Sequence, residues 1–322
     1  MEYYQKPNPT LWKGRKSNGN QYLHEKIICQ RFDELQAIDP ERQRSFALLG
    51  YACDEGVRRN LGRTGAQDGP DHIRKMLAKT ANHLDDQTQI IDTGDIICPD
   101  HNLENAQEEL SKTVEKLLDL GQFPVLLGGG HDIAYGHYRG IKSFLNQKRP
   151  GQSIGIINMD AHFDLRLTEN GANSGTPFYQ IARESEPGKF HYLALGIQRH
   201  SNARSLFETA ESVGANYILN EDLTQWSFEK ASQVIEDFLA KVDKIYLSVD
   251  LDGFSSSIAP GVSAPSPFGI TIEIGMEIIK LIGRSEKLIS IDIAEINPVY
   301  DTDDRTARLA AGLINFIISN SH

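Results

Sequence analysis

Eight apolar runs rich in β-branched residues most constrain the fold of this 322-residue chain. The runs are continuous rather than alternating, which is typical of strands buried on both faces of a parallel sheet. Helical patterns separate most of them, so we expect a mostly parallel α/β sheet of about eight strands with helices on both faces. The runs occupy residues 46–52, 89–97, 124–130, 153–160, 191–197, 215–219, 245–252 and 288–296, and the helical patterns 70–82, 104–120, 201–212, 226–242, 272–283 and 304–319.

The alternating pattern suggests one main domain, residues 45–322, because no convincing linker interrupts it. Residues 1–44 are polar and rich in Lys, Asn and Gln, which predicts an N-terminal arm lying on that domain. Two Pro/Gly/Ser-rich segments, 169–178 and 255–269, are expected to form walls of a cleft. For the second segment, a mobile surface loop is the alternative interpretation.

Composition excludes several partners. A net charge of −11 with no local Lys/Arg run argues against nucleic acid. No apolar segment reaches membrane-span length and the first residues lack a signal-peptide core, so we expect a cytoplasmic protein without a membrane partner. Cys29, Cys53 and Cys98 have no CxxC spacing, and we interpret them as buried small hydrophobes. The oligomeric state stays open, including a homo-oligomer.

Three short acidic and imidazole motifs follow apolar runs: GGGHD at 128–132, DAHFD at 160–164 and SVDLDG at 248–253. Because α/β folds place their chemistry where strands end, the three motifs are expected to close on one site. Residues two apart in an extended strand share a face, so Asp160 and His162 should project together, as should Asp250 and Asp252. The candidate ligands are His131, Asp160, His162, Asp164, Asp250 and Asp252.

Four aspartates gathered without a cation would repel one another and raise each other's pKa values. Two divalent cations would balance their charge, and oxygen-rich ligation with two imidazoles favours a manganese-like ion. Each motif alone has a structural interpretation, because Asp132 or Asp164 could simply cap a helix and a GGG turn can simply reverse the chain. The joint constellation favours the metal site.

The three motifs, with APGVSAPSPFG at 259–269, resemble the signatures of the ureohydrolase family, which includes arginase, agmatinase and formimidoylglutamase. The resemblance runs from about residue 45 to the end of the chain. Within the family it is strongest to formimidoylglutamases, through DEGVRRNLGRTGAQDGP at 54–70, NSGTPF at 173–178 and the Gly-Val-Ser-Ala-Pro form of the loop at 261–265.

The resemblance implies a three-layer α/β/α catalytic domain with two Mn²⁺ per chain at the carboxyl edge of the sheet. One ion would be held by His131, Asp160, Asp164 and Asp250, and the other by Asp160, His162, Asp250 and Asp252. Hydroxide bridging the ions would attack the amidine carbon of N-formimidoyl-L-glutamate and release L-glutamate and formamide, a step in histidine degradation. Asp164 would carry the proton to the departing amine, and Glu295 would pair with the cationic N–C–N group. The alternative for Glu295 is a purely structural role, as a helix cap or a surface carboxylate.

The substrate's two carboxylates need a positive anchor in so acidic a protein, and arginine suits carboxylate best. Arg63 and Arg199 are the candidates, although either could instead pair with a nearby acid. Neutral donors are expected from Asn170, Asn173 and Ser174.

One position departs from arginase. Alignment of Ser174-Gly175 places Phe178 where arginase has its proton-shuttling histidine, and phenylalanine transfers no proton. An arginase activity is therefore disfavoured. The alternatives are an agmatinase or other guanidino-acid ureohydrolase, and a metal-dependent binding protein without catalysis. The complete ligand set argues against the binding protein. A nucleotide-binding loop is excluded because 127–132 lacks the GxGxxG spacing and the Lys-Ser/Thr pair.

Overall fold

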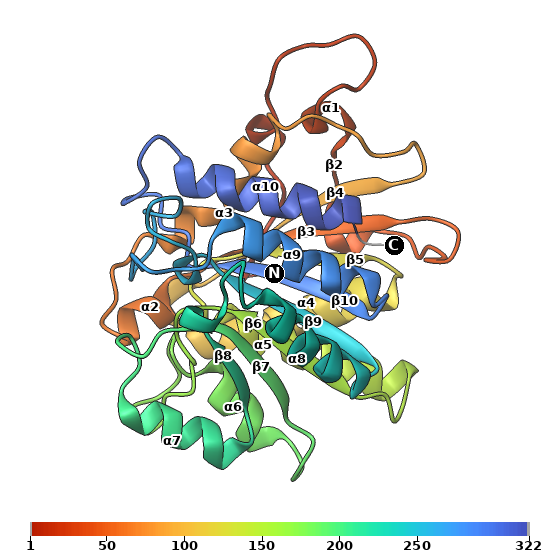
Figure 1. Cartoon of the computed structure of the whole chain (residues 1–322). Helices are drawn as coiled ribbons and strands as arrows, with labels where there is room; N and C mark the ends of the chain where they lie inside the picture. Colours follow the sequence, from red (N-terminus) through yellow and green to blue (C-terminus); the bar gives the residue numbers. More distant parts are fainter. Residues whose placement is uncertain (1, 321–322) are drawn as a thin grey trace.

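The computed structural model describes residues 2–320 as a three-layer α/β/α domain (Figure 1). The expected architecture is confirmed: all eight apolar runs form strands, and every pairing among them is parallel. The sheet order of the eight is β4-β3-β5-β10-β9-β6-β7-β8. The strands are β3 (Ser45–Ala52), β4 (Gln89–Ile97), β5 (Phe123–Leu127), β6 (Ile154–Met159), β7 (His191–Ile197), β8 (Asn216–Leu219), β9 (Lys244–Asp250) and β10 (Leu288–Ala294).

Helices bury apolar faces on both sides of the sheet and so form two separate hydrophobic cores. One core contains α3, α8, α9 and α10, and the other contains α4, α5, α6 and α7. All six predicted helices are present, with shifted ends. The helices are α1 (Leu23–Lys26), α2 (Glu55–Arg59), α3 (Gly69–Leu77), α4 (Leu103–Asp119), α5 (Ile133–Lys148), α6 (Pro177–Glu184), α7 (Arg204–Val213), α8 (Phe228–Ala240), α9 (Ile272–Arg284) and α10 (Arg305–Asn320).

Helix α5 was not predicted, because Gly136 and Gly140 weaken its helical pattern. Both glycines face α4. A Cβ on Gly136 would lie 2.7 Å from the carbonyl oxygen of Gln107, and one on Gly140 would lie 2.6 Å from that of Ser111. Close packing of the two helices therefore explains glycine within this helix.

Residues before Ser45 add to the sheet edge. Strand β1 (Tyr4–Gln5) pairs antiparallel with β4, and β2 (Ile28–Cys29) pairs with β4 in parallel. The indole Nε1 of Trp12 donates to Asp92 on β4 at 2.8 Å. The boundary between an arm and a domain at residue 45 stays a prediction.

Arg74 on α3 holds two buried carboxylates at this edge. Its Nε donates to Asp92 at 3.1 Å and its Nη1 to Asp95 at 2.6 Å, and the Arg74 side chain is 1% exposed. Because Arg74→Met would leave both carboxylates without their cation, we expect it to lower the free energy of unfolding by about 3–5 kcal/mol. Arg204, which is 93% exposed, is the control, and Arg204→Met should cost less than about 1 kcal/mol. Urea denaturation measures both, and equal midpoints would contradict this role for Arg74.

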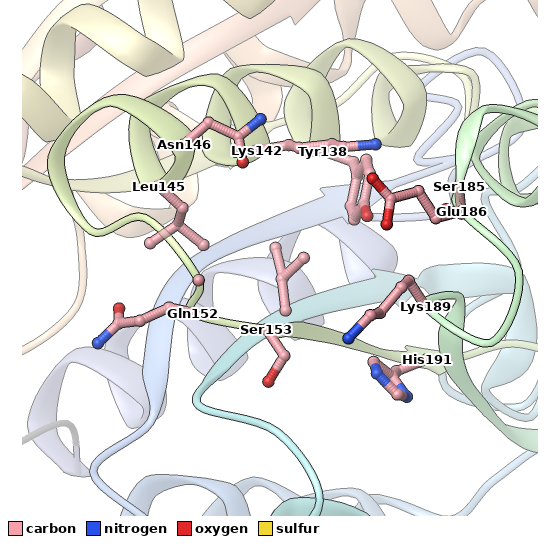
Figure 2. A pocket seen from close by; sticks show the side chains of 12 residues that line it. Tyr138, Lys142, Leu145, Asn146, Gln152, Ser153, Ser185, Glu186, Lys189 and His191 are labelled. Atoms are coloured by element: carbon pink, nitrogen blue, oxygen red, sulfur yellow. The ribbon is translucent and has the colours of Figure 1, made fainter.

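The two edges of the sheet differ in chemistry. A hollow at the amino edge, where β6 and β7 begin, is lined by Tyr138, Lys142, Ser153, Lys189 and His191, among others (Figure 2). In residues 2–320, the groups of His, Asp and Glu close enough to hold a metal ion lie instead at the carboxyl edge. No helix in this described range is long and apolar enough to cross a membrane.

Candidate metal centre

Four neighbouring strands, β5, β10, β9 and β6, carry the candidate site at their carboxyl ends. The loop after β5 brings in His131, and its glycines are required by close packing. A Cβ on Gly129 would lie 2.1 Å from the carbonyl oxygen of Cys53, and one on Gly128 would lie 2.5 Å from that of Ile293. The triple glycine therefore lets the chain pass between β3 and β10 and direct His131 into the site.

The first ligand group surrounds the Nδ1 atom of His131. This atom lies 3.2 Å from an oxygen of Asp160, 2.8 Å from one of Asp164 and 2.9 Å from one of Asp250. It makes no hydrogen bond within residues 2–320, and Asp252 Oδ1 is likewise buried and unpartnered. A buried nitrogen facing three carboxylate oxygens without hydrogen-bond geometry fits a divalent cation between them.

The second ligand group consists of Asp160, His162 and Asp252. The Nδ1 atom of His162 lies 3.2 Å from Asp252 Oδ2 and 3.5 Å from Asp160 Oδ1. Asp160 belongs to both groups, which is the arrangement that a bridging carboxylate requires. Asp250 belongs to the first group only, so its bridging role stays a prediction.

The local backbone differs from the predicted extended strands. Strand β6 ends before Asp160, and Asp252 lies in a 3-10 turn after β9. In each pair the first aspartate accepts a hydrogen bond from the amide two residues later: Asp160 from His162 at 2.7 Å, and Asp250 from Asp252 at 2.8 Å. The extended conformation expected for these pairs was therefore wrong, because Asx-type turns bend the chain there, although Asp160 and His162 do meet in the second ligand group.

The buried carboxylates of the site repel one another electrostatically, and this repulsion is reflected in their pKa values. Burial, with the charge of Asp160, raises the pKa of Asp164 to about 6. Burial and neighbouring carboxylates also raise the pKa values of Asp250 and Asp252. Burial acts the same way on Asp160, but the nearby imidazoles of His131 and His162 outweigh it and lower the pKa of that carboxyl. A bound cation would relieve the crowding by replacing protons.

Hydrogen bonds beneath the site fix the tautomer of His131. Its Nε2 lies 2.9 Å from Ser248 Oγ, and that hydroxyl donates to Asp292 at 2.6 Å. Because the only hydroxyl proton goes to Asp292, Nε2 must carry the imidazole proton. Nδ1 is therefore free to bind a metal ion.

Two acidic residues of the site have left-handed backbone conformations. Asp164 has φ 48° and Glu295 has φ 64°. Aspartate adopts this conformation readily, but for Glu295 it is costly, and such costly conformations cluster at functional sites. Glu295 is 4% exposed, accepts a hydrogen bond from the His131 amide at 2.9 Å, and lines the pocket above the ligands.

Only some of the predicted substrate-binding residues line the pocket. Arg63 and Ser174 line it, whereas Asn173 lies buried nearby and accepts a hydrogen bond from the Gly175 amide. Asn170 is exposed and does not line the pocket. Arg199 is also outside it: its side chain is 65% exposed and pairs with Glu221 at 3.1 Å.

Arg166 is a charged pocket residue that the sequence analysis did not predict. It lines the pocket beside His162 and Asp164, and its guanidinium makes no hydrogen bond or ion pair within residues 2–320. A Cβ on Gly175 would lie 2.8 Å from Arg166 Cδ, so the glycine makes room for this side chain. The signal available in the sequence was its place two residues after the last ligand of DAHFD.

Phe178 closes the side of the first ligand group. It is fully buried, its ring lies edge-on to the His131 imidazole with centroids 5.4 Å apart, and it stacks on Tyr192 at 4.6 Å. An apolar ring therefore occupies this side of the site.

Comparison with known proteins agrees with this geometry. A model of the arginase family matches residues 44–319. The formimidoylglutamase of Geobacillus thermodenitrificans is 42% identical over 96% of this chain and 94% of its own, and that of Aeromonas salmonicida is 40% identical over 98% and 99%. The chain therefore belongs to the arginase family, as predicted.

Solved structures share the fold. Trypanosoma cruzi formiminoglutamase, solved with Mn²⁺₂, has a TM-score of 0.73 and 27% identity, covering 90% of this chain and 98% of its own. Formimidoylglutamase from Bacillus subtilis has a TM-score of 0.80 and 24% identity, covering 95% and 93%.

Proposed function

We propose that this protein hydrolyses N-formimidoyl-L-glutamate to L-glutamate and formamide. The observation that carries the proposal is one pocket that brings together residues of two metal-ligand groups, the buried acid Glu295 and the exposed arginine Arg166. The curated relatives of similar length, which are named formimidoylglutamases, support the same activity.

Two Mn²⁺ ions per chain fit the donor set of four carboxylates and two imidazoles. Asp160 would be shared between them, and we assign Asp250 to both as well. When bound, two divalent ions lower the pKa of water enough to supply hydroxide near neutral pH. The ligands proposed are His131, Asp160, Asp164 and Asp250 for the first ion, and Asp160, His162, Asp250 and Asp252 for the second.

Glu295 is proposed to orient the substrate. Burial and the charges of Asp250 and Asp252 raise its pKa well above the usual value. A cationic N–C–N group beside it would favour the carboxylate form and would be held in place by that charge. The left-handed backbone at Glu295 directs the side chain toward the ligands, where the amidine carbon must lie.

Asp164 is proposed to transfer a proton to the departing amine nitrogen. Its carboxylate lines the pocket, and one of its oxygens lies 2.8 Å from His131 Nδ1 in the first ligand group, so Asp164 is placed to accept a proton at the metal site and pass it on. Phe178, which packs beside His131, has no ionisable group and cannot transfer this proton. The amine must be protonated before the tetrahedral carbon collapses, because an unprotonated amine is a poor leaving group.

Arg166 is proposed to bind a substrate carboxylate. Its side chain lines the same pocket as several of the metal ligands, and its guanidinium makes no hydrogen bond or ion pair within residues 2–320, whereas Arg199 lies outside the pocket and pairs with Glu221. Ser174 is proposed to be a neutral donor at the pocket wall. Asn173 is proposed to position Ser174 indirectly, because its side chain accepts a hydrogen bond from the Gly175 amide in the same loop. Asn170 is the least supported of the predicted contacts, because it is exposed outside the pocket.

Arg166→Met should lower kcat/KM for N-formimidoyl-L-glutamate by about 30- to 900-fold, which corresponds to about 2–4 kcal/mol, through loss of a charge-assisted pair and of its positioning. Metal content should not change. Arg199→Met is the matched control and should leave kcat/KM unchanged. The assay measures formamide and glutamate release with metal content by elemental analysis. Wild-type kcat/KM in the Arg166 variant would reject this anchor, and absence of product from the wild-type protein would reject the function.

A further inference from the structure

Three loops far apart in the sequence meet at one wall of the metal pocket. They are residues 60–65, 261–264 and 295–300. Arg63, Ser263 and Ala264 line the pocket, and Glu295 lies at the start of the third loop. The shape of this wall therefore depends on what joins the loops.

Arg63 joins the first loop to the second. Its Nε donates to the carbonyl oxygen of Ser263 at 2.8 Å, and its Nη2 donates to that of Val262. The Arg63 amide donates to Ser263 Oγ at 2.9 Å. The guanidinium also lies over the ring of Tyr300, 3.9 Å from the centroid, which brings in the third loop.

Asn297 completes the connection from the end of β10. Its Nδ2 donates to the carbonyl oxygens of Arg63 at 2.8 Å and Thr64 at 3.0 Å, and its amide donates to that of Gly261 at 2.7 Å. The residue is fully buried and lies two positions after Glu295. A Cβ on Gly65, at φ 128°, would lie 2.4 Å from Asn297 Oδ1, so the approach requires glycine.

We propose that Arg63 is a positioning residue whose guanidinium holds the 261–264 loop against the pocket, and not a direct anchor for a substrate carboxylate. The side edge of the guanidinium, Nε with Nη2, already donates to two carbonyl oxygens, which leaves only the Nη1 end for any other acceptor. This set of contacts, made by Arg63, Ser263, Asn297 and Tyr300, we term the Arg63 clasp. The inference rests on the proposed function only for its kinetic consequence.

Substitution of Arg63 by lysine distinguishes a positioning role, which depends on the shape of the guanidinium, from an anchoring role, which depends on its charge. Lysine keeps the positive charge, but it cannot donate from a planar fork to two carbonyls or stack in the same way. If Arg63 positions the loop, Arg63→Lys and Arg63→Met should raise KM alike, by about tenfold, with a smaller change in kcat. If it anchors a carboxylate by charge, lysine should restore most of the affinity that methionine loses.

Hydrogen–deuterium exchange tests the clasp independently of activity. In the manganese-loaded full chain, both Arg63 variants should increase amide exchange in residues 62–65 and 261–264 by about tenfold, with little change in the central strands. Arg199→Met, an exposed arginine outside the pocket, should change neither exchange nor KM. Exchange equal to wild type in both Arg63 variants, or a KM restored by lysine, would overturn the proposal. If the wild-type protein yields no formamide, the exchange result still decides the clasp, so failure of the proposed function is separable.

Discussion

Asp160→Asn is expected to remove both metal ions and to lower kcat/KM by more than about 100-fold, beyond the usual effect of residues that only support a ligand. Asp160 is the residue that both ligand groups share, facing His131 at 3.2 Å and His162 at 3.5 Å. Asparagine keeps the shape but loses the charge, so it can neither bridge two cations nor offset their repulsion.

Elemental analysis after dialysis, with an activity assay on the same sample, measures the effect. His131→Asn should chiefly weaken one ion, because His131 belongs to the first group only. Asp250→Asn distinguishes the proposed bridge from the observed grouping: loss of both ions supports the bridge, and loss of one restricts Asp250 to the first ion. Asp243→Asn, at an exposed carboxylate outside both groups, is the control. Two ions and full activity in the Asp160 variant would contradict the shared ligand.

Agmatine and arginine are expected to be poor substrates, with kcat/KM lower by about 10²- to 10³-fold than for N-formimidoyl-L-glutamate, as the loss of a charge-assisted contact implies. Agmatine has no carboxylate, so its binding would leave the Arg166 guanidinium unpaired beside the metal site. Arginine has one carboxylate but adds an ammonium near that guanidinium.

Urea release from agmatine or arginine, compared with formamide release under the same conditions, measures this selectivity. Arg166→Met should reduce the ratio of kcat/KM for N-formimidoyl-L-glutamate to kcat/KM for agmatine, mainly by lowering kcat/KM for N-formimidoyl-L-glutamate. Urea production at a comparable kcat/KM would leave family membership intact but would reject the proposed substrate.

The strands were predictable because parallel strands buried on both faces leave continuous apolar runs in the sequence. Helix α5 left no such pattern. Its glycines, Gly136 and Gly140, serve contacts with α4, and a contact between helices is not visible in local propensity. The short helix α6 was not predicted either, because it begins within the Gly/Pro-rich segment that was expected to form a loop.

The convergence of the three motifs was predictable because strand ends of a parallel sheet meet at one edge. The turns at Asp160 and Asp250 were not, because their amide hydrogen bonds depend on backbone geometry that strand periodicity does not encode. Arginine roles were the hardest to assign. Whether a guanidinium is free, as at Arg166, or occupied, as at Arg63, depends on partners about 200 residues away in some cases.

Manganese titration of chelator-stripped protein, with glutamate and formamide measured together, tests the account most directly. The account predicts no turnover without metal, equimolar formation of both products from N-formimidoyl-L-glutamate, and activity that saturates at two Mn²⁺ per chain. Full activity in the stripped protein, saturation at one ion, or no release of either product at saturating manganese would contradict it.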